Sequence, residues 1–498
     1  WHSSNLLPRL SVRNLKDASC RACLCSVDAC HTSTSPPDFF SEAGQLLSLI
    51  TTHTISAPLD NVWSWHTRPG AVQRLTPPFL PMTVVSGANS LRNGTTVFSL
   101  PAGQKWVARH QPDGYVEGEQ FVDEAANTPI KQLTRWHHEH RFEADGEKTC
   151  ITDTVRTSVP ETVLAPAFAY RQHQLAEDLA FLCRMGQLGS DETPRKLTVA
   201  MTGSRGLVGT ALSAQLSTAG HEVIQLVRGK ASDGQRHWDM HDPAPALFDG
   251  IDAVVHLAGE SIMGRFTDGH KAEIYSSRVG PTRRLAQLAG ETGVRTFVSA
   301  SAVGFYGTDA GGRVHTEADS RGDGFLADVV DEWERATAPA AQAGVRTVNI
   351  RTGLALSGAG GLLPLLKLSA ATAMSARFGD GNFWMSWVAL DDLTDIYFRA
   401  LVDDSLSGPV NATTPNPVTN AELSATLTSL LHRPEFFGIP EFGPRLLLGD
   451  EGARELALAD QRVEPARLNE LNHHFRYPTL TAALAHELGK ETYFHDLS

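Results

Sequence analysis

A glycine-rich loop near the middle of the chain has the spacing of a dinucleotide-binding site. It lies between the apolar stretch Leu197–Met201 and a helical pattern at Leu207–Ala219. Glycine lets the backbone approach a pyrophosphate, and the first turn of a helix offers unpaired N–H groups and a partial positive charge. A glycine triplet alone is weak evidence, but here a strand, the loop, a helix and a second strand follow in register. We therefore predict dinucleotide binding by the loop residues Gly203, Ser204, Arg205, Gly206, Leu207, Val208 and Gly209.

The end of the second strand indicates which dinucleotide binds. An NAD site requires a carboxylate there to accept hydrogen bonds from the ribose 2′-hydroxyl. In this chain the strand Glu222–Val227 is followed by Arg228. A guanidinium group complements a 2′-phosphate in shape and charge, and Arg205 could add a second cation. The alternative is that Arg228 is a solvated charge at the end of a strand. The pattern favours NADP(H) as the cofactor.

Motifs after the glycine loop occur in the order typical of one superfamily. They are His256-Leu-Ala-Gly259, Ser299–Gly307, Glu273–Arg278, Gly324–Val329 with Trp333-Glu334, Arg351-Thr-Gly353, Trp384–Asp392 and Gly408–Pro415. With these motifs, Lys196–Leu488 resembles the extended short-chain dehydrogenase/reductases, in particular their atypical sugar-nucleotide-epimerase-like branch, also labelled cell-division-inhibitor-like. The resemblance implies an epimerase or oxidoreductase with a small C-terminal substrate subdomain. It also implies cofactor contacts at Val227, Arg228, Leu257, Ala258, Gly259, Glu273, Arg278 and Ala355, although Glu273 and Arg278 could instead form a charge pair on a helix surface.

The proton-transfer pair of that superfamily is missing from this chain. Its members carry a Tyr and, four residues later, a Lys that lowers the phenol pKa for general acid–base catalysis. The corresponding positions here are Phe325 and Val329, and neither side chain can carry a proton. The nearest hydroxyl groups are those of Ser301, which we expect to orient a substrate oxygen, and Tyr306, which we expect to act as the acid.

Two functions of different class therefore remain open. The first is an NADP(H)-dependent oxidoreductase or epimerase acting on an unidentified small molecule. The second is a non-catalytic sensor or carrier that binds NADP(H) and a ligand. Analogy at the level of the fold favours the enzyme.

The elements that must position these residues form two domains. Strands at Ala253–Leu257, Thr296–Ser299 and Thr347–Ile350 alternate with helix-length stretches, which predicts a doubly wound parallel sheet of the Rossmann type over residues 196–498. The turn-rich stretch Gly186–Lys196 predicts a domain boundary, so we expect the two halves to fold separately.

Residues 46–187 have a different pattern. Antiparallel strands are expected at Tyr115–Val122, Lys131–Phe142 and Thr149–Ser158, with helices near Asp60–Leu75 and at Thr162–Met185. This order resembles the α+β helix-grip fold of the START and polyketide-cyclase-like superfamily, which implies a cavity for an apolar ligand. The histidines at 137, 138 and 140 could form a metal cluster, but only two of them share a strand face. We therefore favour surface and cross-strand histidines over a metal site.

Composition limits the remaining possibilities. A chain of 498 residues with 41% apolar and 20% charged residues is typical of a globular protein with two or three domains. The net charge of −13 argues against a nucleic-acid partner, and no apolar run is long enough to span a membrane. Residues 1–45 have the composition of a disordered leader without a secretory signal, so we expect a cytoplasmic protein. Cys20, Cys23, Cys25 and Cys30 lack the second half of a zinc site, so no metal is expected there either.

Overall fold

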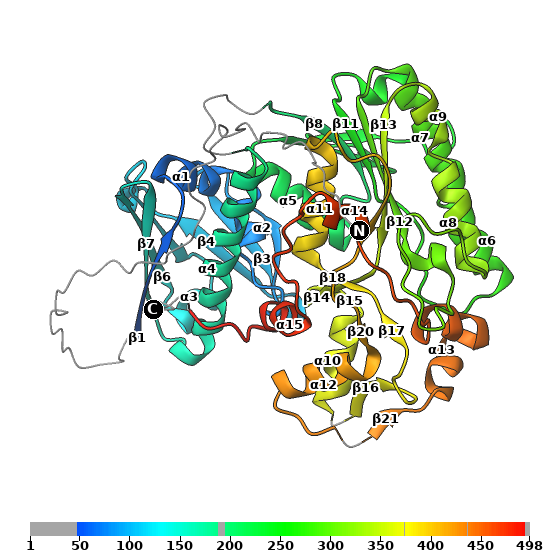
Figure 1. Cartoon of the computed structure of the whole chain (residues 1–498). Helices are drawn as coiled ribbons and strands as arrows, with labels where there is room; N and C mark the ends of the chain where they lie inside the picture. The colour runs from blue at the N-terminus through cyan, green and yellow to red at the C-terminus, as the bar shows by residue number, and fades with distance from the viewer. Residues whose placement is uncertain (1–46, 188–194, 373, 436, 494–498) are drawn as a thin grey trace, which may run out of the picture.

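Two seven-stranded sheets organise the chain in the computed structural model (Figure 1). The structure describes residues 47–187, 195–372, 374–435 and 437–493. The expected leader 1–45, with its four cysteines, and most of the expected boundary at 186–196 lie outside these ranges. Within them, no helix is both long and apolar enough to cross a bilayer.

The first sheet is antiparallel throughout, with the strand order β1-β7-β6-β5-β4-β3-β2. A hairpin turn at Gly146-Glu147 joins β6 to β7. The expected strand Lys131–Phe142 is wrong in its first part, because residues after Pro129 form the short helix α3 (Ile130–Thr134) and the alternating pattern starts only at Trp136. The strands are β1 (Leu47–Ile55), β2 (Thr83–Ser86), β3 (Thr95–Ser99), β4 (Lys105–His110), β5 (Gln120–Ala125), β6 (His137–Asp145) and β7 (Lys148–Thr157).

Besides α3, the helices α1, α2 and α4 accompany this sheet. The long helix α4 (Glu161–Arg184) has Phe168, Leu175, Leu179 and Leu182 buried at the expected helical spacing, which confirms its prediction. The single helix expected near Asp60–Leu75 is two helices, α1 (Leu59–Thr67) and α2 (Ala71–Arg74), because Pro69 and Gly70 interrupt it. Phe168 of α4 packs with Leu49 and Val155 of the sheet, so α4 covers one sheet face.

The second sheet is parallel, with the order β10-β9-β8-β11-β12-β13-β19. This order confirms the expected Rossmann-like parallel sheet, because the chain runs outward in both directions from β8. The expected strands are present, with bounds shifted by at most three residues, and β10 and β19 occur in addition to them. The strands of this sheet are β8 (Thr198–Thr202), β9 (Glu222–Val227), β10 (Gln235–His237), β11 (Ala253–His256), β12 (Thr296–Ala302), β13 (Arg346–Thr352) and β19 (Gly408–Ala412).

Helices cover both faces of the parallel sheet. In Figure 1, α7, α8 and α9 lie on the side away from the first domain, while α5 and α11 lie on the side toward it. These helices are α5 (Leu207–Thr218), α6 (Asp268–Ser276), α7 (Val279–Glu291), α8 (Phe325–Arg335), α9 (Ala338–Gln342) and α11 (Leu390–Val402).

A smaller C-terminal part completes the second domain. Its helix α12 begins with a capping box, in which Thr419 and Glu422 each accept a hydrogen bond from the backbone of the other. Its elements are β14 (Leu354–Ser357), β15 (Gly360–Gly361), α10 (Leu363–Ala371), β16 (Met374–Phe378), β17 (Trp384–Met385), β18 (Trp387–Ala389), β20 (Val418–Thr419), α12 (Asn420–Leu430), β21 (Phe437–Ile439), α13 (Phe442–Gly452), α14 (Ala466–Glu470) and α15 (Leu480–Leu488).

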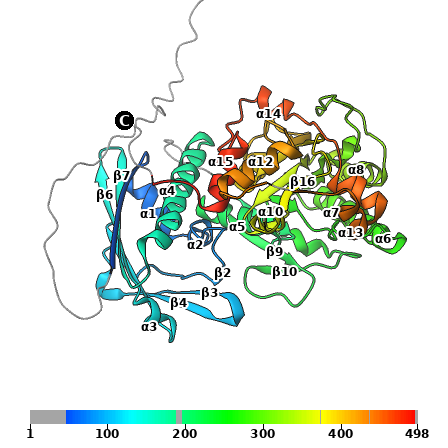
Figure 2. The same ribbon diagram turned by 90° about the horizontal axis from the view of Figure 1, so that it is seen from below.

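The two domains share one apolar core. Phe181 of α4 packs edge-on against Phe398 of α11, with ring centroids 5.3 Å apart. Figure 2 shows α2 beside α5, and a Cβ atom at Gly70 would lie only 2.1 Å from the carbonyl oxygen of Ala214 in α5. Only glycine fits at this contact. The first domain therefore packs closely on the helix that follows the glycine loop.

Candidate cofactor site and interdomain pocket

The glycine loop joins β8 to α5 at the centre of the parallel sheet. Gly203 has φ +67°, and a Cβ atom there would lie 2.8 Å from the carbonyl carbon of Leu257. A Cβ atom at Gly209 would lie 2.3 Å from the carbonyl oxygen of Gly203. Gly206 is exposed and precedes α5 without a capping side chain. The first N–H groups of α5 therefore face an open position, where a pyrophosphate could accept their hydrogen bonds.

The ends of β8 and β11 are tied together beside this loop. The Thr202 hydroxyl oxygen accepts hydrogen bonds from the backbone N–H groups of Leu257, at 3.1 Å, and Ala258, at 3.2 Å. Strands β9 and β11 flank β8 on opposite sides, and the chain reverses direction across the sheet at this point. Open α/β sheets bind ligands at such a switch point. The structure therefore brings Val227, Leu257 and Ala258 to the same edge as the glycine loop.

Two arginines near this edge have no partner among the residues that the structure describes. The side chains of Arg205, in the loop, and Arg228, directly after β9, are exposed. Neither guanidinium group makes a hydrogen bond or an ion pair with any residue that the structure describes. Both cations are therefore available to an anionic ligand.

The other residues expected to contact the cofactor differ in burial and in their partners. Arg278 donates to the carbonyl oxygens of Glu260, at 2.8 Å, and Ile274, at 3.1 Å. Its guanidinium also lies against Gly259, and burial lowers its pKa to about 10. Glu273 is exposed on α6 and does not pair with Arg278. Ala355 lies in β14, half-buried against the shared core with Val208 and Leu257.

Ser301 and Tyr306 belong to one buried polar network at the carboxyl ends of three strands. Ser301, Arg351 and Asn411 are in register across β12, β13 and β19, so their side chains point to the same face. The Ser301 hydroxyl donates to Glu334 of α8 at 2.5 Å, and Arg351 makes a bidentate ion pair with Glu334 at 2.7 and 2.8 Å.

Tyr306 forms the other end of this network. Its hydroxyl accepts a hydrogen bond from Arg351 at 2.9 Å and donates one to Asn411 at 2.8 Å. Burial raises the pKa of Tyr306 to about 12, although Arg351 opposes the shift. The phenol is therefore protonated at neutral pH, and Arg351 would stabilise the phenolate left after proton donation.

Sequence reasoning assigned no role to Glu334, Arg351 or Asn411. All three lie in motifs that serve above only as family signatures, namely Trp333-Glu334, Arg351-Thr-Gly353 and Gly408–Pro415. The signal that could have indicated a network is the opposite charge of Glu334, in α8, and Arg351, in β13.

The position of the missing tyrosine is filled by aromatic packing. Phe325 begins α8 and packs edge-on against Phe266, with centroids 5.4 Å apart. The ammonium group of Lys271 lies 4.7 Å from the centroid of the Phe325 ring and pairs with Glu451 at 2.8 Å. Val329 is buried one turn later. A lysine is thus present near the place of the missing pair, but it comes from α6.

A pocket of about 700 Å³ lies between the two domains and adjoins the glycine loop. Residues 205–207 and 357–360 form its walls on the side of the second domain, and residues 76–84 form its walls on the side of the first. Its polar lining includes Arg74, Asp391 and Glu487. Sequence reasoning missed this pocket because its walls are far apart along the chain.

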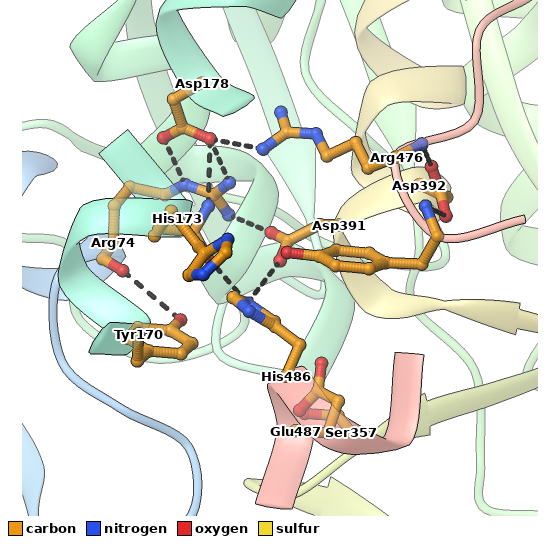
Figure 3. Close-up of polar contacts among 12 residues, drawn as sticks. Arg74, Tyr170, His173, Asp178, Ser357, Asp391, Asp392, Arg476, His486 and Glu487 are labelled. Atoms are coloured by element: carbon orange, nitrogen blue, oxygen red, sulfur yellow. Dashed lines mark hydrogen bonds and ion pairs between the residues drawn. The ribbon is translucent and has the colours of Figure 1, made fainter. Parts of the chain in front are cut away.

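The polar lining belongs to a buried ionic cluster that joins the domains. Figure 3 shows the guanidinium of Arg74 between Asp178 and Asp391, with His486 beyond Asp391. Arg74 pairs with Asp391 at 2.7 Å, and Arg476 pairs with Asp178 at 2.7 Å, so an ion pair crosses the interface in each direction. Burial opposes the charged form of His486, but Asp391 and Glu491 raise its pKa to about 10.

A second pocket, of about 220 Å³, lies inside the first domain. Its walls are mostly apolar and include Leu75, Leu91, Trp106, Phe121 and Phe168. It shares Thr76, Pro77, Leu80 and Met82 with the interdomain pocket. One chain segment therefore separates the interior of the first domain from the space beside the glycine loop.

Comparison with known protein families agrees with this geometry. Residues 199–411 match the NAD dependent epimerase/dehydratase family, and residues 439–487 match a domain of unknown function. An epimerase family protein of Mycobacterium leprae is 38% identical over 302 residues, which cover 59% of this chain and 97% of that protein. A chloroplastic epimerase family protein of Arabidopsis thaliana, a SDR39U1 homologue, is 34% identical over 310 residues, or 60% of this chain and 88% of that protein.

Two solved structures extend the comparison. A nucleoside-diphosphate sugar epimerase from Corynebacterium glutamicum is 51% identical, with a TM-score of 0.80, and covers 90% of this chain and 91% of its own. The human epimerase family protein SDR39U1, solved with NADPH, is 27% identical, with a TM-score of 0.53, and covers 59% of this chain and 99% of its own. The similarity to the bacterial structure is too extensive to be confined to the second domain.

Proposed function

The chain belongs to the epimerase family, and from this membership we propose that it is an NADP(H)-dependent oxidoreductase or epimerase acting on a small molecule. The observation that carries the cofactor assignment is the pair of exposed, unpaired guanidinium groups of Arg205 and Arg228 beside the glycine loop. A 2′-phosphate carries the charge that these groups complement, and the adenosine ribose lies at the end of the second strand in sites of this type. The NADPH in the related human structure supports the same cofactor.

The remaining contacts of the proposed cofactor follow from the fold. The loop residues 203–209 hold the pyrophosphate, and Val227 and Arg228 hold the adenosine. Leu257, Ala258 and Gly259 line the crevice, with Arg278 behind Gly259. Glu273 and Ala355 complete the set that we predicted. Ala355 packs on the same core as the loop, and Glu273 lies exposed on α6.

For the chemical step, we assign Ser301 to orientation of the substrate oxygen and Tyr306 to proton donation. The raised pKa keeps Tyr306 protonated at neutral pH, as an acid requires. Arg351 donates a hydrogen bond to the phenol oxygen and so favours the anion formed when the proton leaves. Glu334 fixes both Ser301 and Arg351 and is a positioning residue.

The first domain is assigned to the START and polyketide-cyclase-like helix-grip class, with an apolar ligand in its internal pocket. The antiparallel sheet with α4 across one face supports this assignment, as does the apolar lining of the pocket. Because the two pockets share the segment at residues 76–82, the first domain could present its ligand to the second. The mycobacterial relative and the human structure each cover 59% of this chain and nearly all of their own length, which supports separate folding of residues 196–498.

The test is turnover of NADPH by the full chain against a panel of carbonyl compounds and sugar nucleotides. NADPH absorbance detects a reductase, and chromatography of the products detects an epimerase. With an active substrate, Tyr306→Phe should lower kcat by about 10²- to 10⁴-fold while NADPH affinity is retained. Tyr115→Phe, in the other domain, is the matched control and should leave kcat unchanged.

Two outcomes would contradict the proposal. Undiminished turnover by Tyr306→Phe would remove Tyr306 from the mechanism. NADPH binding without turnover of any compound in the panel would favour the alternative, a non-catalytic sensor or carrier.

A further inference from the structure

Three side chains in the first domain converge on one point in its internal pocket. Asp123 of β5 lies opposite His138 of β6 in the register of the sheet, and His140 is two residues further along β6 on the same face. One oxygen or nitrogen atom from each residue lies within 4.8 Å of the other two. All three residues line the pocket. This group was not expected from the sequence, which indicated no metal site.

The outward atoms of all three side chains are already held by hydrogen bonds. His138 donates from Nε2 to Asp153 Oδ1 at 3.0 Å, and His140 Nδ1 lies 2.8 Å from the same oxygen. The second oxygen of Asp123, Oδ1, accepts a hydrogen bond from the Trp136 indole at 2.9 Å. Metal-bound histidines in proteins donate their other N–H to a carboxylate in this way, which fixes the ring and its tautomer.

Two separations between the inward atoms match those between the ligands of a metal ion. Asp123 Oδ2 lies 3.4 Å from His138 Nδ1 and 3.5 Å from His140 Nε2. These separations are long for hydrogen bonds to a carboxylate. Zinc bonds of about 2.0–2.1 Å at tetrahedral angles place neighbouring ligand atoms roughly 3.3–3.4 Å apart. Two imidazoles and one carboxylate are also a ligand set that zinc adopts when one coordination position stays open.

The surrounding residues leave the fourth, open coordination position of the metal ion facing the pocket. Asp153 does not line the pocket, so the outer carboxylate lies behind the ligands and the inward atoms face the cavity. Phe121 stacks on His140 with ring centroids 4.1 Å apart, and Phe168 packs edge-on against His138 at 5.3 Å. These aromatic contacts help to hold both imidazoles in place.

We propose that Asp123, His138 and His140 bind a zinc ion, with Asp153 and Trp136 as its outer partners and an open coordination position facing the pocket. The charges agree with this assignment, because two carboxylates and two neutral imidazoles balance one divalent cation. The site would bind an apolar molecule through a single oxygen-donor group. This proposal does not depend on the cofactor or the chemistry assigned to the second domain.

The test is metal titration of the full chain, with Cys20, Cys23, Cys25 and Cys30 each replaced by Ser so that thiolates outside the described residues do not contribute. After treatment with a chelator, the protein should bind one Zn²⁺ per chain. Co²⁺ in the same site should give the intense visible absorption of a tetrahedral complex with nitrogen and oxygen ligands. His138→Gln, His140→Gln and Asp123→Asn should each weaken binding by more than about 100-fold, and Asp153→Asn by about 10- to 100-fold.

His137→Gln is the matched control, because His137 lies on the opposite face of β6 and contacts Glu124 instead. It should bind Zn²⁺ as the unmodified site does. The near-ultraviolet circular dichroism spectrum of each variant separates loss of binding from loss of folding. Failure of the folded full chain to bind one Zn²⁺, a weak octahedral Co²⁺ spectrum, or unchanged binding in folded His140→Gln would each overturn the proposal.

Discussion

Two regions of this molecule use arginine in opposite ways. At the domain interface, Arg74 and Arg476 are buried, and every ion pair they make is with a carboxylate of the protein. At the glycine loop, Arg205 and Arg228 are exposed and make no ion pair with any described residue. Burial of a charge is tolerated only with a partner, whereas an exposed charge keeps its hydration and stays available.

The difference separates a structural role from a binding role. Arg476 is fully buried and pairs with Asp178 of the first domain and Asp395 of its own. Its partners are already in place, so no ligand is needed. Arg228 has no such partner in the described part of the chain, although it follows a strand whose end faces the proposed ribose. An exposed arginine without an ion-pair partner therefore indicates a ligand-binding site better than a buried, paired arginine does.

Removal of a buried arginine should have the largest effect. Arg476→Met leaves Asp178 and Asp395 without one of their cations inside the protein. We expect the free energy of unfolding to fall by about 3–5 kcal/mol, because a buried carboxylate that loses its partner is strongly destabilising. Urea denaturation followed by circular dichroism measures this change.

Arg335→Met is the control for this substitution. Arg335 pairs with Asp331 and Glu332 on the surface of α8, with 65% of its side chain exposed. Loss of these pairs should cost about 1 kcal/mol or less. If the two substitutions cost the same, the interface cluster does not contribute to stability as we propose.

The same cluster should make stability depend on pH. Burial raises the pKa of Glu487 from 4.5 to about 7, although His486 opposes the shift. The folded state then binds the Glu487 proton more tightly than the unfolded state, so this stabilisation is complete below about pH 4.5 and is lost as the pH rises toward 7. Relative to the unmodified chain, Glu487→Gln should gain up to about 3 kcal/mol of stability between pH 5 and pH 8.

Urea denaturation at each pH measures the effect of Glu487→Gln. The control is Glu441→Gln, because Glu441 is exposed on the surface and pairs only with Arg445. Its stability should follow that of the unmodified chain at every pH. If the free energy of unfolding depends on pH in the same way for Glu487→Gln and the unmodified chain, then ionisation of Glu487 does not destabilise the folded state.

A substitution at the exposed arginine should act on binding and leave stability unchanged. Arg228→Asp should weaken NADPH binding by about 1.5–3 kcal/mol, because a charge-assisted hydrogen bond to the phosphate is lost. NADH affinity should change little, so the preference for NADPH should disappear. Titration calorimetry measures both affinities, and Arg433→Asp, at another exposed arginine, is the control.

Salt provides a further check on this contrast. Higher ionic strength should reduce the preference for NADPH, because exposed charges are screened, but should leave the cost of Arg476→Met unchanged. Equal affinity for NADPH and NADH in the unmodified chain would contradict the role of Arg228.

The local sequence pattern was sufficient to predict most strands and the glycine loop of the second domain. The strand Glu222–Val227 was predicted to the residue, and the order of strand, loop and helix around Gly203 is observed. These predictions succeed because buried parallel strands are short apolar runs, and a helix of recognisable length follows β8, β11 and β12. The elements of the first domain were harder to predict from the sequence. Pro69 and Gly70 interrupt a helical pattern, and Pro129 precedes a short helix where a strand was expected.

In the candidate sites, local sequence patterns identified single residues but not the contacts between distant ones. Ser301 and Tyr306 were chosen as the nearest hydroxyl groups in sequence, but their link through Glu334 and Arg351 depends on α8 packing beside three strands. In the same way, His138 and His140 were recognised as sharing a strand face, but Asp123 and Asp153 join them only through strand register.

The sequence by itself therefore determined the elements, the glycine loop and the charge at the end of the second strand. These depend on residues close together in the chain, whose spacing sets the backbone conformation directly. Only the tertiary structure decided which charges are paired. Arg74 meets Asp391 across more than 300 residues, whereas Arg228 meets no described residue. Whether a side chain is buried with a partner or exposed without one depends on how distant elements pack, and no local pattern contains that information.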